Sequence, residues 1–446
     1  MKAAILYFES INDREKEELA TQCEVLEQFY GDLVEFLPPS PVGAKLPECA
    51  DVVVFPQLVG AAFGEKKSLQ KITLPVIVLT SEFGTVEMWD WEIVTFLRDA
   101  GLTVFSPYNV ELAKCIFRAI DCKKHMENGM RFLMFQDDPG EGMQAGIFKR
   151  FYWWEKECTQ QMETAFGLKM IYRSYKDLCE RAGSIDDELA KTLSNNWDVP
   201  MENVSEADYL KAVKIYIAVK EVISEVGGLD SIKGVGANCL NESFHSDTTP
   251  CLAWNMLYEK DNLLWACEGD TLTLVSKYIF YSILRKPIMM TNIYPFLMGM
   301  AALKHEKIDS FPNIPNGDNH ALCVHCGYFG LAPQSFCTHW MLRPKVLGIV
   351  DDNAIMVDCR MAEGPVTLAK LHSDMKQVTL IECEIVNYIQ YPGSDCRNGA
   401  LLHYVNNNGH VIMDALSSHH ALLIQGNQIP ELVQSLRVFG FKVNQL

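Results

Sequence analysis

The segment that constrains the fold most strongly covers residues 263–292, where two apolar runs flank a helical pattern. Residues 263–267 and 287–291 have the length and apolarity of buried parallel strands. Between them, apolar side chains recur on one face of a helix over residues 271–285. The sequence therefore predicts one βαβ unit of an open parallel sheet.

Polar side chains follow these runs at the strand ends, where open parallel sheets bind ligands. Glu268 follows the first run, Asn292 follows the second, and a third predicted strand ends in His325. Oxygen and nitrogen donors are therefore expected to converge on one point. The alternative is that Glu268 or Asp270 only caps the following helix, since acidic residues favour helix starts.

Cysteine and histidine residues around His325 raise the alternative of a structural zinc site. The four residues concerned are Cys323, Cys326, Cys337 and His339. Their spacing differs from that of usual zinc fingers, which favours the interpretation that Cys323 and Cys326 face the protein core.

A pair of histidines, His419 and His420, lies near the carboxyl terminus. Adjacent residues of an extended segment point to opposite sides, so at most one of them naturally faces a shared site. Carboxylate oxygen from Glu268 combined with imidazole from His420 or His325 suits Mn²⁺ or Mg²⁺ better than thiolate-loving zinc.

Composition and charge narrow the class of protein. The 446 residues carry a net charge of −18, which disfavours binding to nucleic acid and to anionic membrane surfaces. No run reaches the roughly 18 apolar residues of a membrane helix, and the first residues lack the pattern of a signal peptide. The 15 cysteines are spread without the spacing of a disulfide scaffold. We therefore expect a cytoplasmic enzyme or binding protein whose partners are small molecules and protein chains.

Three regions differ in pattern and predict three domains. Residues 1–160 alternate strands and helices, as in a Rossmann-like, doubly wound α/β domain. Residues 161–343 begin with helices and then resume the alternation, which predicts a second doubly wound parallel α/β domain that carries the metal-site residues. Residues 344–446 contain short alternating runs typical of an antiparallel β-barrel or sheet.

Individual elements are also predicted within these regions. Helices are expected over residues 13–30 and after Ser205, which has the side chain of a helix cap. Residues 131–136 are expected to form a strand near the edge of the first domain. Residues 345–351 and 410–414 are expected to be strands of the last domain.

Four segments together resemble the fucose isomerase and arabinose isomerase superfamily, especially its fucose isomerase-like branch. They are TPCLAWNMLYEKDNLLWACEGDTLTLV, CVHCGYFGLAP, GPVTLAKL and SSHHALLIQG. The similarity covers roughly residues 165–446 in order. The amino-terminal α/β domain fits the same architecture without a diagnostic motif.

This resemblance implies an aldose–ketose isomerase with a divalent cation, usually Mn²⁺, between the second and third domains. Glu268 matches the family glutamate that binds metal and acts as an acid or base. Asn292 falls where the family has a second carboxylate that serves as ligand and base. His420, with His419 as the alternative, matches a metal-binding histidine, and His325 stands where the arabinose isomerase branch has a further histidine, assigned here to substrate binding.

Asn292 departs from the family pattern in a way that bears on catalysis. An amide oxygen coordinates a hard cation but cannot accept a proton at neutral pH. Asp270 could supply the missing base, the chemistry could differ, or the chain could be a sugar-binding relative without isomerase activity. The leading hypothesis is a sugar isomerase that acts through a cis-enediolate, with a carboxylate carrying the proton between C1 and C2.

The resemblance also implies a homo-oligomer, a hexamer or trimer, in which one amino-terminal domain closes the cleft of a neighbouring subunit. Trp89 and Trp91 are the aromatic residues that suit such a contact, because flat rings are enriched at interfaces and cover apolar sugar faces. We expect at least one of these rings to border a neighbour's cleft. The alternative is that both rings pack into the core of their own domain.

Overall fold

The computed structural model describes two compact units of the chain. The described residues are 1–9, 12–58, 60–137, 155–295, 314–326, 328–329, 331–346, 348, 350–390 and 399–446. The first unit contains Met1–His125, Ser282–Leu284 and Pro430–Gly440, and the second contains Met126–Tyr281, Arg285–Ile429 and Phe441–Leu446. No helix among the described residues is long and apolar enough to cross a membrane.

The first unit is built on a five-stranded parallel sheet with strand order β2-β1-β3-β4-β5. Its strands are β1 (Lys2–Tyr7), β2 (Glu35–Pro41), β3 (Val52–Phe55), β4 (Val76–Val78) and β5 (Val104–Phe105). Every residue of β3 and β4 is apolar and fully buried, as expected for central strands of a parallel sheet.

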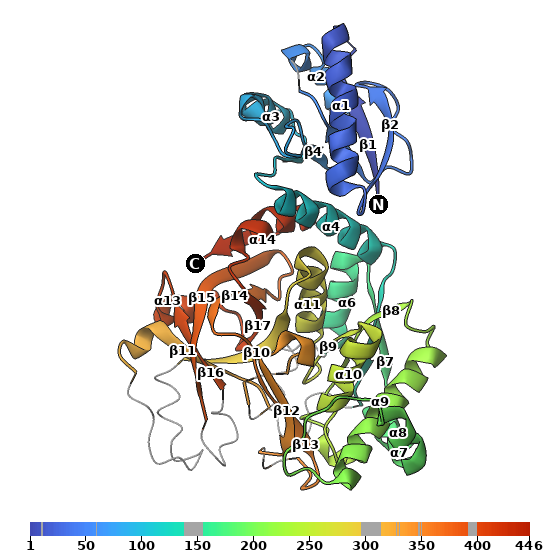
Figure 1. The fold of residues 1–446 in the computed structure, drawn as a ribbon, viewed down its shortest axis with the longest axis vertical. Coiled ribbons are helices and arrows are strands. Elements are labelled where there is room, and N and C mark those ends of the chain that lie inside the picture. The colour runs from blue at the N-terminus through green and yellow to red at the C-terminus, as the bar shows by residue number, and fades with distance from the viewer. Residues whose placement is uncertain are drawn as a thin grey trace. The chain divides into compact units, whose positions relative to one another are not determined.

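Helices of the first unit follow the strands in sequence. They are α1 (Asp13–Tyr30), α2 (Lys66–Leu69), α3 (Trp91–Asp99), α4 (Val110–Glu127) and α14 (Ile429–Ser435), with short 3₁₀ turns at Gly60–Phe63, Met88–Asp90 and Leu436–Phe439. The helix predicted over residues 13–30 is confirmed, and Figure 1 shows it alongside β1 and β2. Asn12 caps it, because its Oδ1 accepts a hydrogen bond from the Glu15 backbone N–H, and the Glu15 carboxylate accepts one from the Asn12 backbone N–H.

The second unit contains a four-stranded parallel sheet with strand order β7-β6-β8-β9. Its strands are β6 (Arg131–Phe135), β7 (Lys169–Arg173), β8 (Ile232–Ala237) and β9 (Leu264–Ala266). The helices are α6 (Lys156–Phe166), α7 (Tyr175–Ser184), α8 (Asp187–Ser194), α9 (Glu206–Glu225), α10 (Cys251–Asp261) and α11 (Thr271–Leu284), with a 3₁₀ turn at Ser243–His245. The predicted cap of α9 is confirmed, since the Ser205 hydroxyl accepts a hydrogen bond from the Asp208 backbone.

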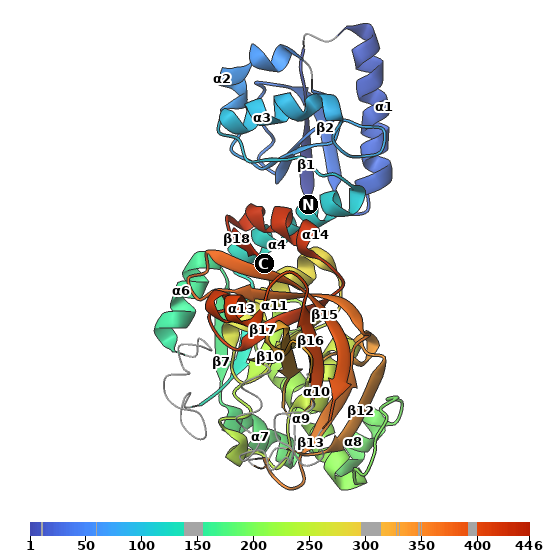
Figure 2. The same ribbon diagram turned by 90° about the vertical axis from the view of Figure 1, so that its left-hand side faces the viewer.

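A closed antiparallel barrel of six strands completes the second unit, drawn mainly in orange and red in Figures 1 and 2. The strands in barrel order are β14 (Gly364–Leu371), β17 (His420–Gln425), β10 (Ile288–Pro295), β11 (His320–Val324), β16 (Gly399–Tyr404) and β15 (Gln377–Ile389). Pairing of β14 with β15 closes the ring, and β18 (Lys442–Gln445) adds to β15 in parallel. Separately, β12 (His339–Pro344) pairs with β13 (Ile355–Arg360), and 3₁₀ turns lie at Gly317–Asn319 and Gln334–Phe336. The β-rich carboxyl-terminal region is therefore confirmed as a barrel.

Two strands that were predicted to be parallel belong to this barrel. β10 pairs antiparallel with β11 and β17, so the prediction that residues 263–292 form a βαβ unit is wrong at its second strand. β10 and β11 are apolar because the barrel buries them, and an apolar run does not reveal the direction of its partner strand. The chain therefore leaves the parallel sheet after β9 and enters the barrel through α11.

Three further predictions are wrong in detail. β6 pairs with β7 and β8 in the second sheet and does not lie at the edge of the first. Residues 410–414 form a helix, α13 (Gly409–Ala415), because Asn408 caps it through the His410 and Val411 backbone amides. The described part of residues 345–351 contains no strand. Division into three domains at residues 160 and 343, and the double winding of the two sheets, stay predictions.

Candidate functional site

The end of β9 leads directly into a tight turn that carries two carboxylates. Glu268 follows the strand with φ 57° and Gly269 with φ 69°, so both occupy the left-handed region, which is unfavourable for a glutamate. Asp270 then caps α11, because its carboxylate accepts hydrogen bonds from the Thr273 backbone N–H and from Thr273 Oγ1, both at 2.7 Å. The predicted capping role therefore belongs to Asp270, and Glu268 is held in a separate position.

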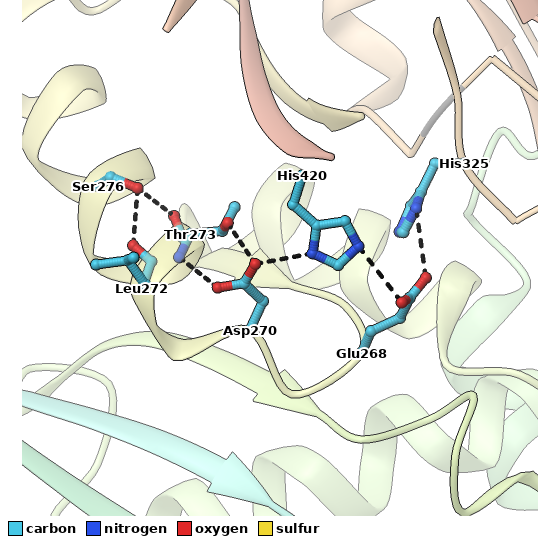
Figure 3. Close-up of polar contacts among 7 residues, drawn as sticks. All are labelled: Glu268, Asp270, Leu272, Thr273, Ser276, His325 and His420. Atoms are coloured by element: carbon cyan, nitrogen blue, oxygen red, sulfur yellow. Dashed lines mark hydrogen bonds and ion pairs between the residues drawn. The ribbon is translucent and has the colours of Figure 1, made fainter. Parts of the chain in front are cut away.

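His420, the first residue of β17, lies between these two carboxylates (Figure 3). Its Nδ1 is 2.8 Å from Asp270 Oδ2, and its Nε2 is 3.4 Å from Glu268 Oε2. An ionised carboxylate can only accept, so Nδ1 carries the hydrogen of the bond to Asp270. Asp270 thereby directs the Nε2 edge of the ring toward Glu268.

His325 approaches Glu268 from the other side, just beyond the end of β11. Its Nδ1 is 3.6 Å from Glu268 Oε1, and the ring is almost completely buried. Neither ring nitrogen of His325 has a hydrogen-bond partner among the described residues. Burial of imidazole nitrogens without a partner is unfavourable, which marks this ring as prepared for a ligand.

Asn292 lies on β10 directly opposite His420 of β17. Residues paired in this way carry their side chains on the same face of the sheet. The Asn292 side chain is 9% exposed, and its Oδ1 is buried without a hydrogen-bond partner among the described residues. A neutral oxygen donor is therefore available beside the His420 ring.

The charges of this cluster are mutually stabilised. Burial alone would raise the pKa of Glu268, but the hydrogen bond and charge of His420, with the charges of His325 and His419, lower it to about 2. Burial opposes ionisation of Asp270 as well, and the same His420 contacts, with the charge of Lys370, hold its pKa below the usual range. For His420, burial lowers the pKa, and hydrogen bonds to Asp270 and Glu268 reverse the effect and raise it.

The remaining basic groups near the site are held toward their neutral forms. Burial lowers the pKa of both His325 and His419 to about 4. Lys277 on α11 is buried, donates a hydrogen bond from Nζ to the Trp265 carbonyl at 3.2 Å, and has its pKa lowered by burial to about 7. Burial also lowers the pKa of Lys370. At neutral pH one nitrogen of the His325 ring is therefore unprotonated and can act as a ligand.

The donor set fits a divalent cation. Glu268 offers carboxylate oxygens, His325 and His420 offer imidazole nitrogens, and Asn292 offers an amide oxygen, with the buried acceptors of His325 and Asn292 lacking partners among the described residues. Cys326 also joins the group, since ligand atoms of Glu268, His325 and Cys326 lie within 4.8 Å of one another. Such a site could bind an ion, orient an oxygen-rich ligand and exchange protons with it.

Sequence reasoning missed some of these residues. The sequence favours a core position for Cys326, although its place directly after His325 at the strand end is a signal for the site. Thr273 and Lys277 lie one and two helical turns after Asp270, and the sequence pattern gives them no role beyond the predicted helix. His419 precedes His420, and the centroids of the two rings are 4.6 Å apart.

The four-residue zinc site is not assembled in the described part of the chain, where the metal-ligand group is Glu268, His325 and Cys326. Cys323 is fully buried in the barrel. His339 Nε2 lies 3.9 Å from a carboxylate oxygen of Asp358.

Trp89 and Trp91 lie in the first unit and are exposed, at 77% and 56%. The alternative that both rings pack into their own core is therefore wrong. Trp89 lines a polar cavity of about 860 Å³ at the carboxyl ends of β3 and β4, together with Gln57, Thr80 and the buried Asp90. A role for either tryptophan in a neighbouring subunit's cleft stays a prediction.

Comparison with known proteins does not assign this site. No protein-family model matches the chain, and no curated protein matches it either. The family and activity that the sequence motifs indicate therefore stay predictions.

Proposed function

We propose that this protein is a divalent-metal-dependent aldose–ketose isomerase that acts through a cis-enediolate. The observation that supports the proposal most is the buried line of proton-exchanging groups Asp270, His420, Glu268 and His325, joined by contacts of 2.8, 3.4 and 3.6 Å. Four ionisable side chains with almost no exposed surface are costly to maintain unless they serve a ligand or a reaction.

The proposed reaction moves a carbonyl between C1 and C2 of a sugar. A proton leaves one carbon and reaches the other, and negative charge develops on the oxygen atoms between these steps. A bound cation would supply electrostatic stabilisation of those oxygens, with Glu268, His420, His325 and Asn292 available to hold it. Mn²⁺ is the ion that the resemblance implies, and Mg²⁺ is the alternative with the same preference for oxygen donors.

Proton transfer falls to Glu268 in this proposal. The low pKa of Glu268 keeps it ionised, so that one carboxylate oxygen can accept the proton from one sugar carbon and return it to the other. His420 Nε2 faces Glu268 and would be the nitrogen that holds the ion, because Nδ1 on the other side of the ring donates its hydrogen to Asp270. Asn292 binds without exchanging protons, so one carboxylate performs both proton transfers.

Asn292 also supports a second candidate function. It stands where the family has a carboxylate base, and the absence of that base favours a sugar-binding relative without turnover. In both candidates we propose a small-molecule sugar as partner, a homo-oligomeric assembly of six or three subunits and a cytoplasmic location.

A panel of aldoses and ketoses in D₂O, with and without Mn²⁺ or Mg²⁺, tests the proposal. An isomerase exchanges the sugar C2 proton for deuterium and converts aldose to ketose, both visible by NMR, and the conversion stops after chelation of the metal. A sugar that binds saturably without exchange or conversion would replace the isomerase by the binding protein. The absence of both binding and exchange across the panel would contradict both candidates.

A further inference from the structure

The residue that the isomerase resemblance does not account for is Cys326. Its ligand atom lies within 4.8 Å of those of Glu268 and His325, and these three form a metal-ligand group of mixed sulfur, oxygen and nitrogen donors. The pair Glu268 Oε1 and His325 Nδ1, at 3.6 Å, is already within reach of one ion, whose bonds to such atoms are about 2.0 to 2.2 Å long.

The backbone carries a second, independent signal at the same residues. Glu268 has φ 57° and Cys326 has φ 52°, so two of the three donors occupy the left-handed region. Non-glycine residues adopt this conformation rarely, and at functional sites the surrounding structure enforces it. Here the Glu268 turn ends β9, and a tight turn follows β11, in which the His325 N–H donates to the Tyr328 carbonyl at 2.7 Å.

The left-handed backbone at Glu268 and Cys326 accompanies the placement of both side chains close to the His325 ring. The His325 ring is 2% exposed and has no hydrogen-bond partner for either nitrogen among the described residues. A buried imidazole of this kind, flanked by a carboxylate and a thiol, is the arrangement expected of a ligand set before the ion enters.

Sulfur changes which ion such a set prefers. Mn²⁺ and Mg²⁺ select oxygen donors, whereas thiolate combined with imidazole selects Zn²⁺ and Co²⁺. We propose that Cys326 is a direct metal ligand and that the centre formed with Glu268 and His325 takes a thiophilic divalent ion in preference to Mn²⁺ or Mg²⁺. This proposal deepens the proposed function by naming its metal class and rests on the metal-binding half of that function, not on turnover.

Binding involves no oxidation or reduction. The Cys326 thiol releases its proton to solvent as the sulfur electron pair forms the bond to the ion. The metal oxidation state and the sulfur oxidation state stay unchanged.

Titration of Co²⁺ into the metal-free full-length protein, without oxygen, tests this assignment directly. Bound thiolate gives a sulfur-to-cobalt charge-transfer band in the near ultraviolet, which oxygen and nitrogen ligands do not give. We expect the band in the wild type, its displacement by Zn²⁺, and its persistence in a large excess of Mn²⁺.

Variants separate Cys326 from its neighbours. Cys326→Ser should lose the band and weaken Co²⁺ binding at least about 100-fold, since loss of an outer partner alone weakens binding 10- to 100-fold. The matched control, Cys323→Ser, changes a buried thiol three residues earlier and should keep the band. Cys326→Asp keeps an anionic ligand in a residue type that tolerates the left-handed region, and should lose the band while binding Mn²⁺ more tightly than the wild type does.

The proposal is overturned if wild-type protein binds no Co²⁺, if it binds Co²⁺ without the band, or if Cys326→Asp keeps the wild-type band or metal preference. Circular dichroism of each variant establishes that it is folded. Sugar exchange measured on the same samples distinguishes the two proposals. Turnover without the band would contradict only the assignment of Cys326 as a ligand, and the band without turnover would contradict only the isomerase activity.

Discussion

Two parallel sheets in this protein end in different surroundings, although the inner strands of both are short and largely buried. The first sheet, β2-β1-β3-β4-β5, ends at a polar cavity where Trp89 is 77% exposed. The second, β7-β6-β8-β9, ends at Glu268, which is 4% exposed. Only the second sheet is followed by barrel strands, and these bring His325 and His420 to the carboxylate.

A buried carboxylate lies at the end of each sheet, and the pKa values of the two are shifted in opposite directions. Burial raises the pKa of Asp90 in the first unit, and a hydrogen bond from Thr80 only partly opposes the change. Glu268 is also penalised by burial, but the hydrogen bond and charge of His420, with the charges of His325 and His419, lower its pKa to about 2. The sheet therefore provides the position, and the imidazoles of the barrel decide whether the carboxylate stays charged.

The largest expected effect is on isomerase turnover and follows from removing the charge of Glu268 at the end of the second sheet. Glu268→Gln should lower isomerase turnover at least about 10³-fold, because it removes the proton-accepting oxygen, and it should weaken metal binding. NMR of C2 exchange and calorimetry of metal binding measure the two effects. Asp90→Asn is the control in the first unit and should leave metal affinity unchanged. Wild-type turnover in Glu268→Gln would remove this residue from the reaction.

A second difference concerns the response of stability to pH. Burial lowers the pKa of His325 to about 4 in the folded protein, from the ordinary histidine value of about 6.5, so only the unfolded state gains a proton between these values. The contribution of neutral His325 to the unfolding free energy is present above pH 6.5 and is lost as the pH falls toward 4. His420 has a raised pKa, so its contribution is instead lost as the pH rises.

For the metal-free protein, His325→Gln should therefore flatten the rise of unfolding free energy with pH. The expected reduction between pH 4 and 6.5 is up to about 1.4 kcal/mol per pH unit, the value for one proton. Urea unfolding at several pH values measures the slope, and His410→Gln, at an exposed position, is the control. An unchanged slope would mean that the His325 ring is not held neutral by burial.

A smaller effect is expected at Asp270, which acts through His420. Asp270→Asn keeps a cap for α11 but presents an amide to His420 Nδ1, which favours the tautomer with hydrogen on Nε2. Metal affinity should fall 10- to 100-fold, as for other partners of ligating histidines. Nitrogen-15 NMR of the imidazoles reports the tautomer, and Thr273→Val removes one contact of Asp270 as the control. An unchanged tautomer would show that Asp270 does not orient the ring.

The smallest effect on stability is expected beside the cavity at the carboxyl ends of β3 and β4. Trp89→Ala and Trp91→Ala remove exposed rings and should change the unfolding free energy by no more than about 0.5 kcal/mol. If either ring borders a neighbouring subunit, its variant should instead lose assembly or sugar binding, measured by light scattering and calorimetry. A monomeric wild type, or folded variants that keep both properties, would remove this role.

The sequence identified much of the candidate site while misjudging the sheet that forms it. Glu268 was found because an apolar strand cannot contain an unpaired charge. His420 was indicated by the family resemblance, since alternation along an extended segment says only that at most one of His419 and His420 faces a shared site. The direction of β10 and β11 could not be read, since apolar runs look alike in parallel sheets and barrels. Their partners also lie far along the chain: β10 pairs with β17, and β11 pairs with β16. Contacts such as His420 with Asp270, and the approach of Cys326, depend on those long-range pairings.

The position of a bound metal ion is the most direct test of the proposed metal centre. Anomalous diffraction from crystals of the full-length protein prepared with Co²⁺ or Mn²⁺ locates the ion without reference to activity. We expect a peak in the second unit in contact with Glu268 and His325. A peak at the carboxylates of the first-unit cavity, beside Glu87 and Asp90, or no peak with either ion, would contradict this expectation.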